Sequence, residues 1–108
     1  MVYTVDEIRQ IVHPIAERYG LQAVYLFGSY ARGTASEDSD IDLLIDTTGT
    51  ELKSLLQVSA VYCELAEALQ KPVDLLTLGS LQQRAQMPSE AEFQNTVWKE
   101  KVDIYVAA

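Results

Sequence analysis

The sequence predicts an α/β (α+β) domain in which a β-sheet is covered by helices. Three short apolar runs have the length and the flanking residues of strands, and amphipathic segments alternate with them. This alternation favours a sheet with helical layers. Helix starts are predicted where Ser or Thr is followed three positions later by Glu or Gln, the spacing of a capping box. They are Thr4 with Glu7, Thr48 with Glu51, Ser80 with Gln83, and Ser89 with Glu92.

The first helix is predicted to follow Thr4 and to end near Gly20, because apolar residues recur at helical spacing between them. These are Ile8, Ile11, Val12 and Ile15. Strands are predicted over residues 23–27, 41–45 and 72–77, each bounded by residues typical of turns. A short helix is expected from Tyr30 to Arg32, ended by Gly33.

Residues 51–70 are predicted to form a long amphipathic helix. Cys63 falls within its apolar stripe and is interpreted as a core residue; as the lone cysteine it forms no intrachain disulfide. The stripe consists of Leu52, Leu55, Leu56, Ser59, Tyr62, Cys63, Ala66 and Leu69.

Residues 90–106 are predicted to form a C-terminal helix with an unusually wide apolar arc. Core packing is the favoured interpretation, and contact with a protein partner is the alternative, because Trp and Tyr are typical interface anchors. One stripe holds Phe93, Val97 and Ile104, and the other holds Trp98, Val102 and Tyr105.

Length and charge limit the possible functions. The 108 residues suit a single domain over residues 1–108, and 16 acidic against 8 basic residues give a net charge of -8. Such a surface repels phosphate backbones and anionic membranes, so direct DNA binding and membrane attachment are not expected. The sequence contains neither an apolar run long enough to span a membrane nor a signal-peptide pattern, and we expect a cytoplasmic protein.

The segment from Phe27 to Asp42 carries the chemistry. Gly28 and Ser29 end the first strand, and ten residues separate Ser29 from Asp40. Asp40 and Asp42 are two positions apart at the next strand, so both carboxylates are expected on one face. Asp74 in the third strand is expected to bring a third carboxylate to that face.

Converging carboxylates repel one another unless a cation lies between them, and hard oxygen ligands suit Mg²⁺ together with substrate phosphates. Gly28 allows a phosphate to approach the backbone, and Ser29 adds a hydroxyl donor. This combination indicates phosphoryl or nucleotidyl transfer. The alternative, a solvated turn with edge-protecting aspartates, is disfavoured because Asp40 and Asp42 are expected within an apolar strand, where charge is costly without a partner.

The same residues resemble a known family. Gly28-Ser29, ten residues, and Asp40-x-Asp42 resemble the signature of the DNA polymerase β nucleotidyltransferase superfamily. The longer strings, residues 25–33 and 39–45, are similar to its minimal nucleotidyltransferase (MNT) branch. The resemblance implies the nucleotidyltransferase fold, a small mixed β-sheet flanked by helices. It also implies a type VII antitoxin, a protein adenylyltransferase that moves AMP from ATP to a tyrosine of a HEPN ribonuclease toxin.

Residue by residue, the resemblance assigns the metal and catalytic roles to Asp40, Asp42 and Asp74, with two Mg²⁺ ions. Asp74 would also take the proton of the attacking hydroxyl. Contacts to ATP are assigned to Gly28, Ser29, Arg32 and Ser39. The larger relatives carry a second domain, which this chain lacks, and a hetero-oligomer with the toxin is expected.

Other polar residues have simpler interpretations. Glu37 and Asp38 are expected on a solvated face, and Asp46 on the surface. His13 is expected at the surface or the edge of the core, since no nucleophile pattern accompanies it. Five acids from Glu37 to Asp46 stand without a basic residue, so much of the net charge is attributed to the cation site and its rim.

Two alternatives to the adenylyltransferase remain. The chain could neutralise the toxin by stoichiometric binding without chemistry. It could also be a nucleotidyltransferase with a small-molecule or RNA acceptor, although the acidic surface disfavours RNA and the missing second domain disfavours a small-molecule pocket.

Overall fold

The strands form one mixed sheet in the order β3-β2-β1-β4. β2 pairs parallel with β3, and β1 pairs antiparallel with both β2 and β4. The computed structural model describes residues 2–50, 52, 54–84 and 88–107. The elements are α1 (Val5–Tyr19), β1 (Ala23–Phe27), α2 (Gly28–Arg32), β2 (Ile41–Asp46), α3 (Leu55–Leu69), β3 (Val73–Thr77), α4 (Leu78–Arg84), α5 (Pro88–Glu100) and β4 (Val102–Val106).

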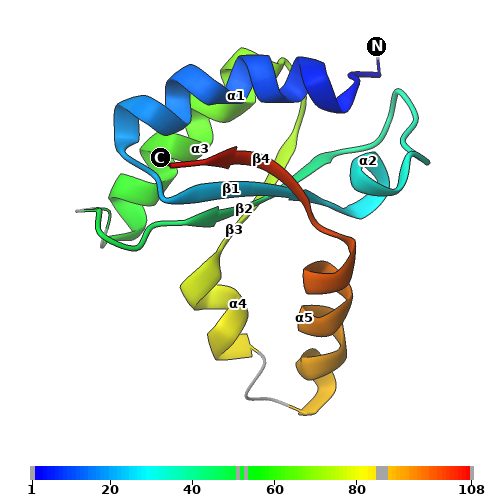
Figure 1. Ribbon diagram of the computed structural model, residues 1–108, viewed down its shortest axis with the longest axis vertical. Helices are drawn as coiled ribbons and strands as arrows, with labels where there is room; N and C mark the ends of the chain where they lie inside the picture. Colours follow the sequence, from blue (N-terminus) through cyan, green and yellow to red (C-terminus); the bar gives the residue numbers. More distant parts are fainter. Residues whose placement is uncertain (1, 51, 53, 85–87, 108) are drawn as a thin grey trace.

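Helices cover both faces of this sheet (Figure 1). α1 and α3 lie on one face, over the larger core cluster, to which β1 contributes Val24 and Leu26. α4 and α5 lie on the other face, over a smaller cluster that includes Phe27, Leu44 and Val97. Alternation of side chains along each strand therefore supplies both cores, and it fixes which face receives Asp42.

The N-terminal part of the fold agrees with the sequence prediction. Thr4 caps α1 through a complete capping box with Glu7, and Gly20 ends the helix in the left-handed conformation. The predicted strand over residues 23–27 coincides with β1, and those over 41–45 and 72–77 each differ from the observed strand by one residue. The short helix α2 ends at Gly33 as expected, although it begins at Gly28.

The prediction of a helix over residues 90–106 was wrong after Glu100, over about its last third. α5 ends at Glu100, and Val102–Val106 form β4, an edge strand that pairs with β1. Val102, Ile104 and Val106 alternate with Asp103 and Tyr105, which is the two-residue period of a strand. The two apolar stripes predicted for one helix therefore belong to two elements.

The predicted apolar stripe of the long helix was wrong in part: Leu69 is buried and Ala66 packs against the larger core cluster, but Leu56 and Cys63 lie outside the core. α3 begins at Leu55 rather than at residue 51, after a capping box between Ser54 and Gln57, and Glu51 lies outside the described residues. Its buried side chains are Val61, Leu65 and Leu69. Leu56 is 82% exposed and Cys63 is exposed, so Cys63 is not a core residue. An almost uniformly apolar helix offers several possible stripes, and packing on the sheet selects one of them.

The later helix starts lie earlier than the capping-box spacing predicted. α4 begins at Leu78, and the Ser80 backbone N–H donates to Oγ1 of Thr77 at 3.1 Å, which makes Thr77 rather than Ser80 the capping side chain. α5 begins at Pro88, so Ser89 lies inside the helix. Proline is favoured at the first position of a helix because its missing N–H would have no partner there. In the described part of the chain, no helix combines the length and hydrophobicity needed to cross a bilayer.

Candidate active site

Gly28 stands where β1 passes directly into α2. Its φ of +74° lies in the left-handed region that favours glycine. A Cβ atom built at this position would overlap Oδ2 and Cγ of Asp42. The backbone of Gly28 and the carboxylate of Asp42 are therefore packed together, and only a residue without a side chain fits between them.

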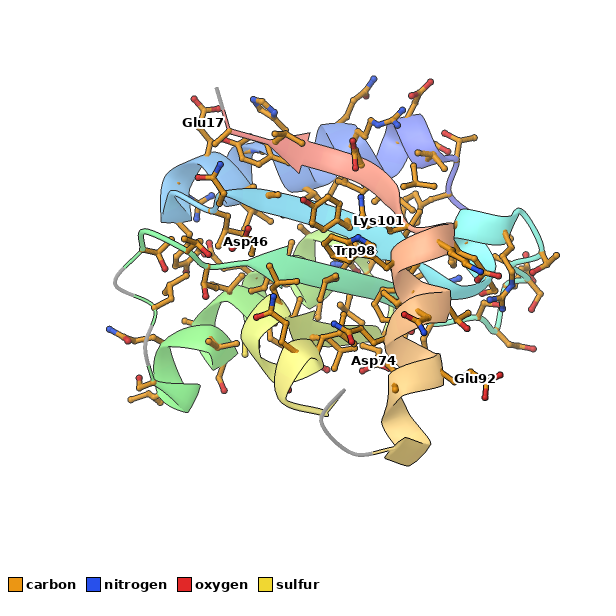
Figure 2. All side chains as sticks on the ribbon, turned by 60° about the horizontal axis from the view of Figure 1, so that its bottom comes forward. Glu17, Asp46, Asp74, Glu92, Trp98 and Lys101 are labelled. Carbon is orange, nitrogen blue, oxygen red and sulfur yellow. The ribbon has the colours of Figure 1, made fainter. Side chains whose placement is uncertain are left out.

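Asp42 and Asp74 lie at the same register position of the parallel β2–β3 pair. Because side chains alternate along a strand, both carboxylates project from the face of the sheet that carries α4 and α5. Figure 2 shows Asp74 on this side of the sheet, beside α5. Asp42 is half-buried and Asp74 is exposed. The sequence prediction that the second and third strands bring these two carboxylates to one face is thus consistent with the fold.

The pKa of the Asp42 carboxyl is raised from 3.8 to about 6. Burial is the largest cause, followed by the negative charges of Asp74 and of Asp40, while Arg32 opposes the shift. Compared with a carboxyl in water, the carboxylate form of Asp42 is less favourable here, and a nearby positive charge would lower its pKa again.

Asp40 lies one residue ahead of β2 and is exposed. Its effect on the pKa of Asp42 shows that it is close enough to act on that carboxyl electrostatically. Among the described residues, however, no three acidic, His or Cys side chains are gathered tightly enough to hold a metal ion between them. Asp42 and Asp74 form the facing pair, and Asp40 stands beside it.

A pocket of about 230 Å³ opens over this pair. Its charged walls are Asp42, Asp74, Arg32 and Glu100. Nη1 of Arg32 donates to Oε2 of Glu100 at 3.0 Å, so an ion pair joins α2 to the last residue of α5. The remaining lining residues are Phe27, Gly28, Phe93, Thr96 and Val97.

The two serines assigned to nucleotide binding lie outside the lining of this pocket. Ser29 is half-buried in α2, and its carbonyl oxygen accepts from the Thr34 backbone N–H at 3.0 Å. The Ser39 hydroxyl accepts from the Ser36 backbone N–H at 2.9 Å, inside the loop before β2. The structure therefore brings Gly28, Arg32, Asp42 and Asp74 together at one pocket. Ser29 lies next to Gly28 in α2, and Ser39 lies in the loop before β2.

The acids around this pair have ordinary surroundings. Glu37 and Asp38 are exposed, as expected for a solvated face. Asp46 is half-buried rather than a plain surface residue, and its Oδ1 accepts from the Thr48 backbone N–H at 2.9 Å. His13 is exposed on α1, and its Nε2 lies 3.0 Å from Oε2 of Glu17. It does not line the pocket.

The donor set fits a hard divalent cation. After burial, the negative charges of Asp74 and Asp40 contribute to the raised pKa of Asp42, so repulsion from both carboxylates reaches this group. A bound cation would relieve that repulsion, and carboxylate oxygens are the ligands that Mg²⁺ takes in proteins. The Gly28 backbone packs directly against the Asp42 carboxylate, so the start of α2 lies beside these oxygens.

Sequence reasoning missed the wall of this pocket that α5 provides. Phe93, Val97 and Glu100 follow one another at helical spacing, and the apolar part of this stripe was predicted as core. Val97 is buried, and the ring of Phe93 lies 6.4 Å from that of Phe27, centroid to centroid. Glu100 continues the stripe, but its role as the partner of Arg32 depends on a contact across 68 positions of the chain.

Comparison with known proteins agrees with this geometry. The family model "Polymerase beta, Nucleotidyltransferase" matches residues 9–105. A Methanocaldococcus jannaschii protein, provisionally named a protein adenylyltransferase, is 42% identical over 77 residues, covering 71% of this chain and 81% of that protein. Protein adenylyltransferase MntA of Thermococcus cleftensis is 39% identical over 82 residues, covering 72% and 81%.

A solved structure shares the fold. It is the complex of a tri-AMPylated Shewanella oneidensis HEPN toxin with MNT antitoxin, and the match covers 96% of this chain and 74% of the matched chain. The TM-score is 0.61 at 20% identity, which shows a likeness of fold. The fold, the facing aspartates and the two relatives agree, and the chain belongs to the polymerase β nucleotidyltransferase family, among its MntA-type protein adenylyltransferases.

Proposed function

We propose that this protein is the antitoxin of a HEPN/MNT toxin–antitoxin pair and that it transfers AMP from ATP to a tyrosine hydroxyl of its HEPN ribonuclease toxin. The observation that carries the proposal is the register pairing of Asp42 with Asp74 beside Gly28. The MntA relative is named a protein adenylyltransferase, and the solved complex of like fold holds an AMPylated HEPN toxin with its MNT antitoxin.

The reaction moves one nucleotidyl group. The acceptor oxygen attacks the α-phosphorus of ATP, the bond to the β-phosphate oxygen breaks, and pyrophosphate leaves. Asp74 is exposed at the pocket and takes the proton of the attacking hydroxyl. Gly28 lets the triphosphate approach the backbone at the start of α2, and Arg32 contributes positive charge beside it. Ser29, in α2, and Ser39, in the loop before β2, complete the proposed contacts. Catalysis of this kind depends mainly on positioning and on charge neutralisation.

Asp40, Asp42 and Asp74 would hold the metal, which we propose is Mg²⁺, as two ions. These carboxylates are hard oxygen donors, and the repulsion within the group favours a dication. When bound, Mg²⁺ neutralises the charge that develops on the phosphates during transfer.

The toxin supplies the acceptor half of the active site, so the working form is a hetero-oligomer of the two chains. The pocket of about 230 Å³ is open, and α5 and the exposed Asp74 stand at its wall. ATP and a ribonuclease toxin that acts on cellular RNA place this complex in the cytoplasm. Neither DNA nor a membrane takes part.

Intact mass spectrometry tests the proposal. The protein, its toxin encoded alongside, ATP and Mg²⁺ are incubated together, and the toxin is expected to gain the mass of one AMP or a multiple. Asp42→Asn is expected to abolish the gain. Asp46→Asn makes the same chemical change at the end of the same strand and is expected to preserve it.

Two outcomes would replace the proposal. If Asp40→Ala combined with Asp42→Ala still neutralises the toxin at the wild-type level, stoichiometric binding is the function. If the toxin gains no mass while a small molecule or an RNA end accepts AMP, the acceptor class is different.

A further inference from the structure

Glu100 puts a third negative charge into the lining of the active-site pocket. The other charged groups of that lining are Asp42, Asp74 and Arg32. Asp42 and Asp74 have a role as metal ligands, whereas Glu100 comes from α5, at the opposite wall. An uncompensated carboxylate at this place would repel a polyphosphate substrate, so its presence needs a reason.

The partner of Glu100 gives that reason. Oε2 of Glu100 accepts from Nη1 of Arg32 at 3.0 Å. Their side chains are 37% and 48% exposed, so both charges remain at the open side of the pocket rather than in the core. Arg32 is the basic residue of the lining, and it also acts on the carboxyl of Asp42.

The chemistry of the guanidinium decides whether Glu100 competes with a phosphate or helps to bind it. A guanidinium carries five N–H donors in a fixed fork, and Glu100 takes a bond from Nη1. Within the described part of the chain, the Arg32 side chain makes this single hydrogen bond. The other N–H groups remain to donate to phosphate oxygens while Nη1 stays on Glu100.

We infer that Glu100 is a positioning residue for ATP, which anchors the Arg32 guanidinium at the pocket so that its other N–H groups can bind the triphosphate. The inference rests on the proposed function, since it takes ATP as the substrate. Long side chains lose rotamer freedom when they bind a ligand, and an anchor already in place removes part of that loss. The pair also joins α2, which carries the triphosphate contacts, to α5, which forms the opposite wall.

The expected effect falls on nucleotide affinity. Exposed ion pairs are weak, so Glu100→Ala is expected to raise the KM for ATP, and the Kd for AMP-PNP, about twofold to fivefold. The kcat is expected to change by less than about twofold, because Glu100 does not touch the reacting atoms. Glu100→Gln keeps an acceptor oxygen for Nη1 and is expected to lie between wild type and Glu100→Ala.

Glu92→Gln is the matched control. Glu92 lies two turns earlier on α5, is exposed, and points away from the sheet (Figure 2). This change removes the same charge from the same helix and is expected to leave both KM and Kd unchanged. A general electrostatic effect of the acidic surface would move the two variants alike.

A double-mutant cycle tests that Glu100 acts through Arg32. In an Arg32→Ala background, Glu100→Ala is expected to have no further effect on the Kd for AMP-PNP. The inference is overturned if Glu100→Ala binds AMP-PNP as tightly as wild type or more tightly, or if its effect persists without Arg32. Failure of the proposed function looks different, because wild-type protein would then bind no AMP-PNP or transfer no AMP to the toxin.

Discussion

Asp42 and Asp74 face each other at one register position of the parallel β2–β3 pair, from strands that are 32 positions apart in the numbering of this sequence. A parallel register holds two carboxylates side by side on a rigid surface, which an isolated loop cannot do. Burial distinguishes their surroundings. Asp42 is half-buried and has a raised pKa, while Asp74 is exposed toward the pocket.

Asp74→Asn separates proton acceptance from nucleotide binding. The amide cannot take the acceptor's proton, so kcat for toxin AMPylation is expected to fall about 10²- to 10⁴-fold. The Kd for AMP-PNP is expected to rise by less than about tenfold, since Arg32 and Gly28 remain. Quenched-flow transfer and calorimetric binding measure the two quantities.

The exposed carboxylate Asp38 offers the control for this change. Asp38→Asn removes the same charge from the loop before β2 and is expected to leave kcat intact. If both variants lose activity equally, general surface charge rather than proton acceptance explains the loss.

Gly28→Ala tests the close approach of the Gly28 backbone to the Asp42 carboxylate. The new methyl group would overlap the Asp42 carboxylate, and the residue would also have to keep a φ of +74°. We expect a loss of activity together with a loss of stability of about 2 kcal/mol or more, from strain and overlap combined. Urea unfolding and the AMP-transfer assay measure these effects.

Gly33→Ala separates the strain from the overlap. Gly33 has a φ of +77°, but a Cβ there would meet no atom within 4 Å. We expect a stability loss of about 1 kcal/mol, with activity kept. Equal loss of activity in both variants would contradict a specific role for the Gly28–Asp42 contact.

Local patterns were sufficient for the elements and carboxylates that depend on neighbouring residues. The three predicted strands are short apolar runs with polar boundaries, so sequence alone predicted them within a residue. The shared face of Asp42 and Asp74 was predicted because strand alternation decides it once the strands are known, and Gly28 was predicted from its place at the end of the first strand. The alternation argument applies less well to Asp40, because this residue precedes β2 and lies beside the pair of Asp42 and Asp74.

Features that depend on contacts between distant segments could not be predicted. β4 was missed because no Gly or Pro separates it from α5, and its alternating residues also fit a helical stripe. The face of α3 was misassigned because Leu56 and Leu65 are equally apolar, and only packing on the sheet distinguishes them. The Arg32–Glu100 pair joins two segments that lie far apart in the sequence, and no local pattern connects them.

The raised pKa of Asp42 predicts a specific pH dependence of metal-free stability. Folding raises this pKa from 3.8 to about 6, so the folded state binds the proton more tightly than the unfolded state. The stabilisation is fully present below pH 3.8 and is lost as the pH rises through 6. We therefore compare the unfolding free energy of the wild type with that of Asp42→Asn in EDTA. The value for the wild type minus the value for the variant is expected to decrease between about pH 4 and pH 7.

Addition of Mg²⁺ at pH 7 is expected to restore stability to wild type and not to Asp42→Asn, because a ligand that binds the folded state stabilises it. Urea denaturation across this pH range measures both effects. A difference between the two proteins that does not change with pH would show that Asp42 titrates normally.

The buried face of α3 is tested by a pair of leucines on the same helix. Leu65 is fully buried, whereas Leu56 is 82% exposed. Leu65→Ala is expected to cost about 2–5 kcal/mol, from lost burial and the cavity that remains. Leu56→Ala is expected to change stability by less than about 0.5 kcal/mol. A higher cost at Leu56 than at Leu65 would mean that α3 packs through the stripe first expected from the sequence.

A substitution at Trp98 tests whether the face of α5 around this residue contacts the toxin. Trp98 is 49% exposed, and its ring meets Tyr25 edge to face at 6.1 Å and Nζ of Lys101 at 5.0 Å (Figure 2). A half-exposed aromatic ring already held in place by neighbours loses little freedom on binding, as interface anchors require. If this face docks the toxin, Trp98→Ala is expected to weaken the complex by about 2 kcal/mol, roughly 30-fold in Kd.

Val106→Ala is the control, since Val106 is 57% exposed on β4 and the change also removes apolar surface. It is expected to leave the Kd for the toxin unchanged, and AMP-PNP should bind both variants as it binds wild type. Circular dichroism confirms that each variant is folded. A folded Trp98→Ala protein with wild-type toxin affinity would assign Trp98 to packing against Tyr25 and Lys101, and the acceptor would then approach the pocket over another surface.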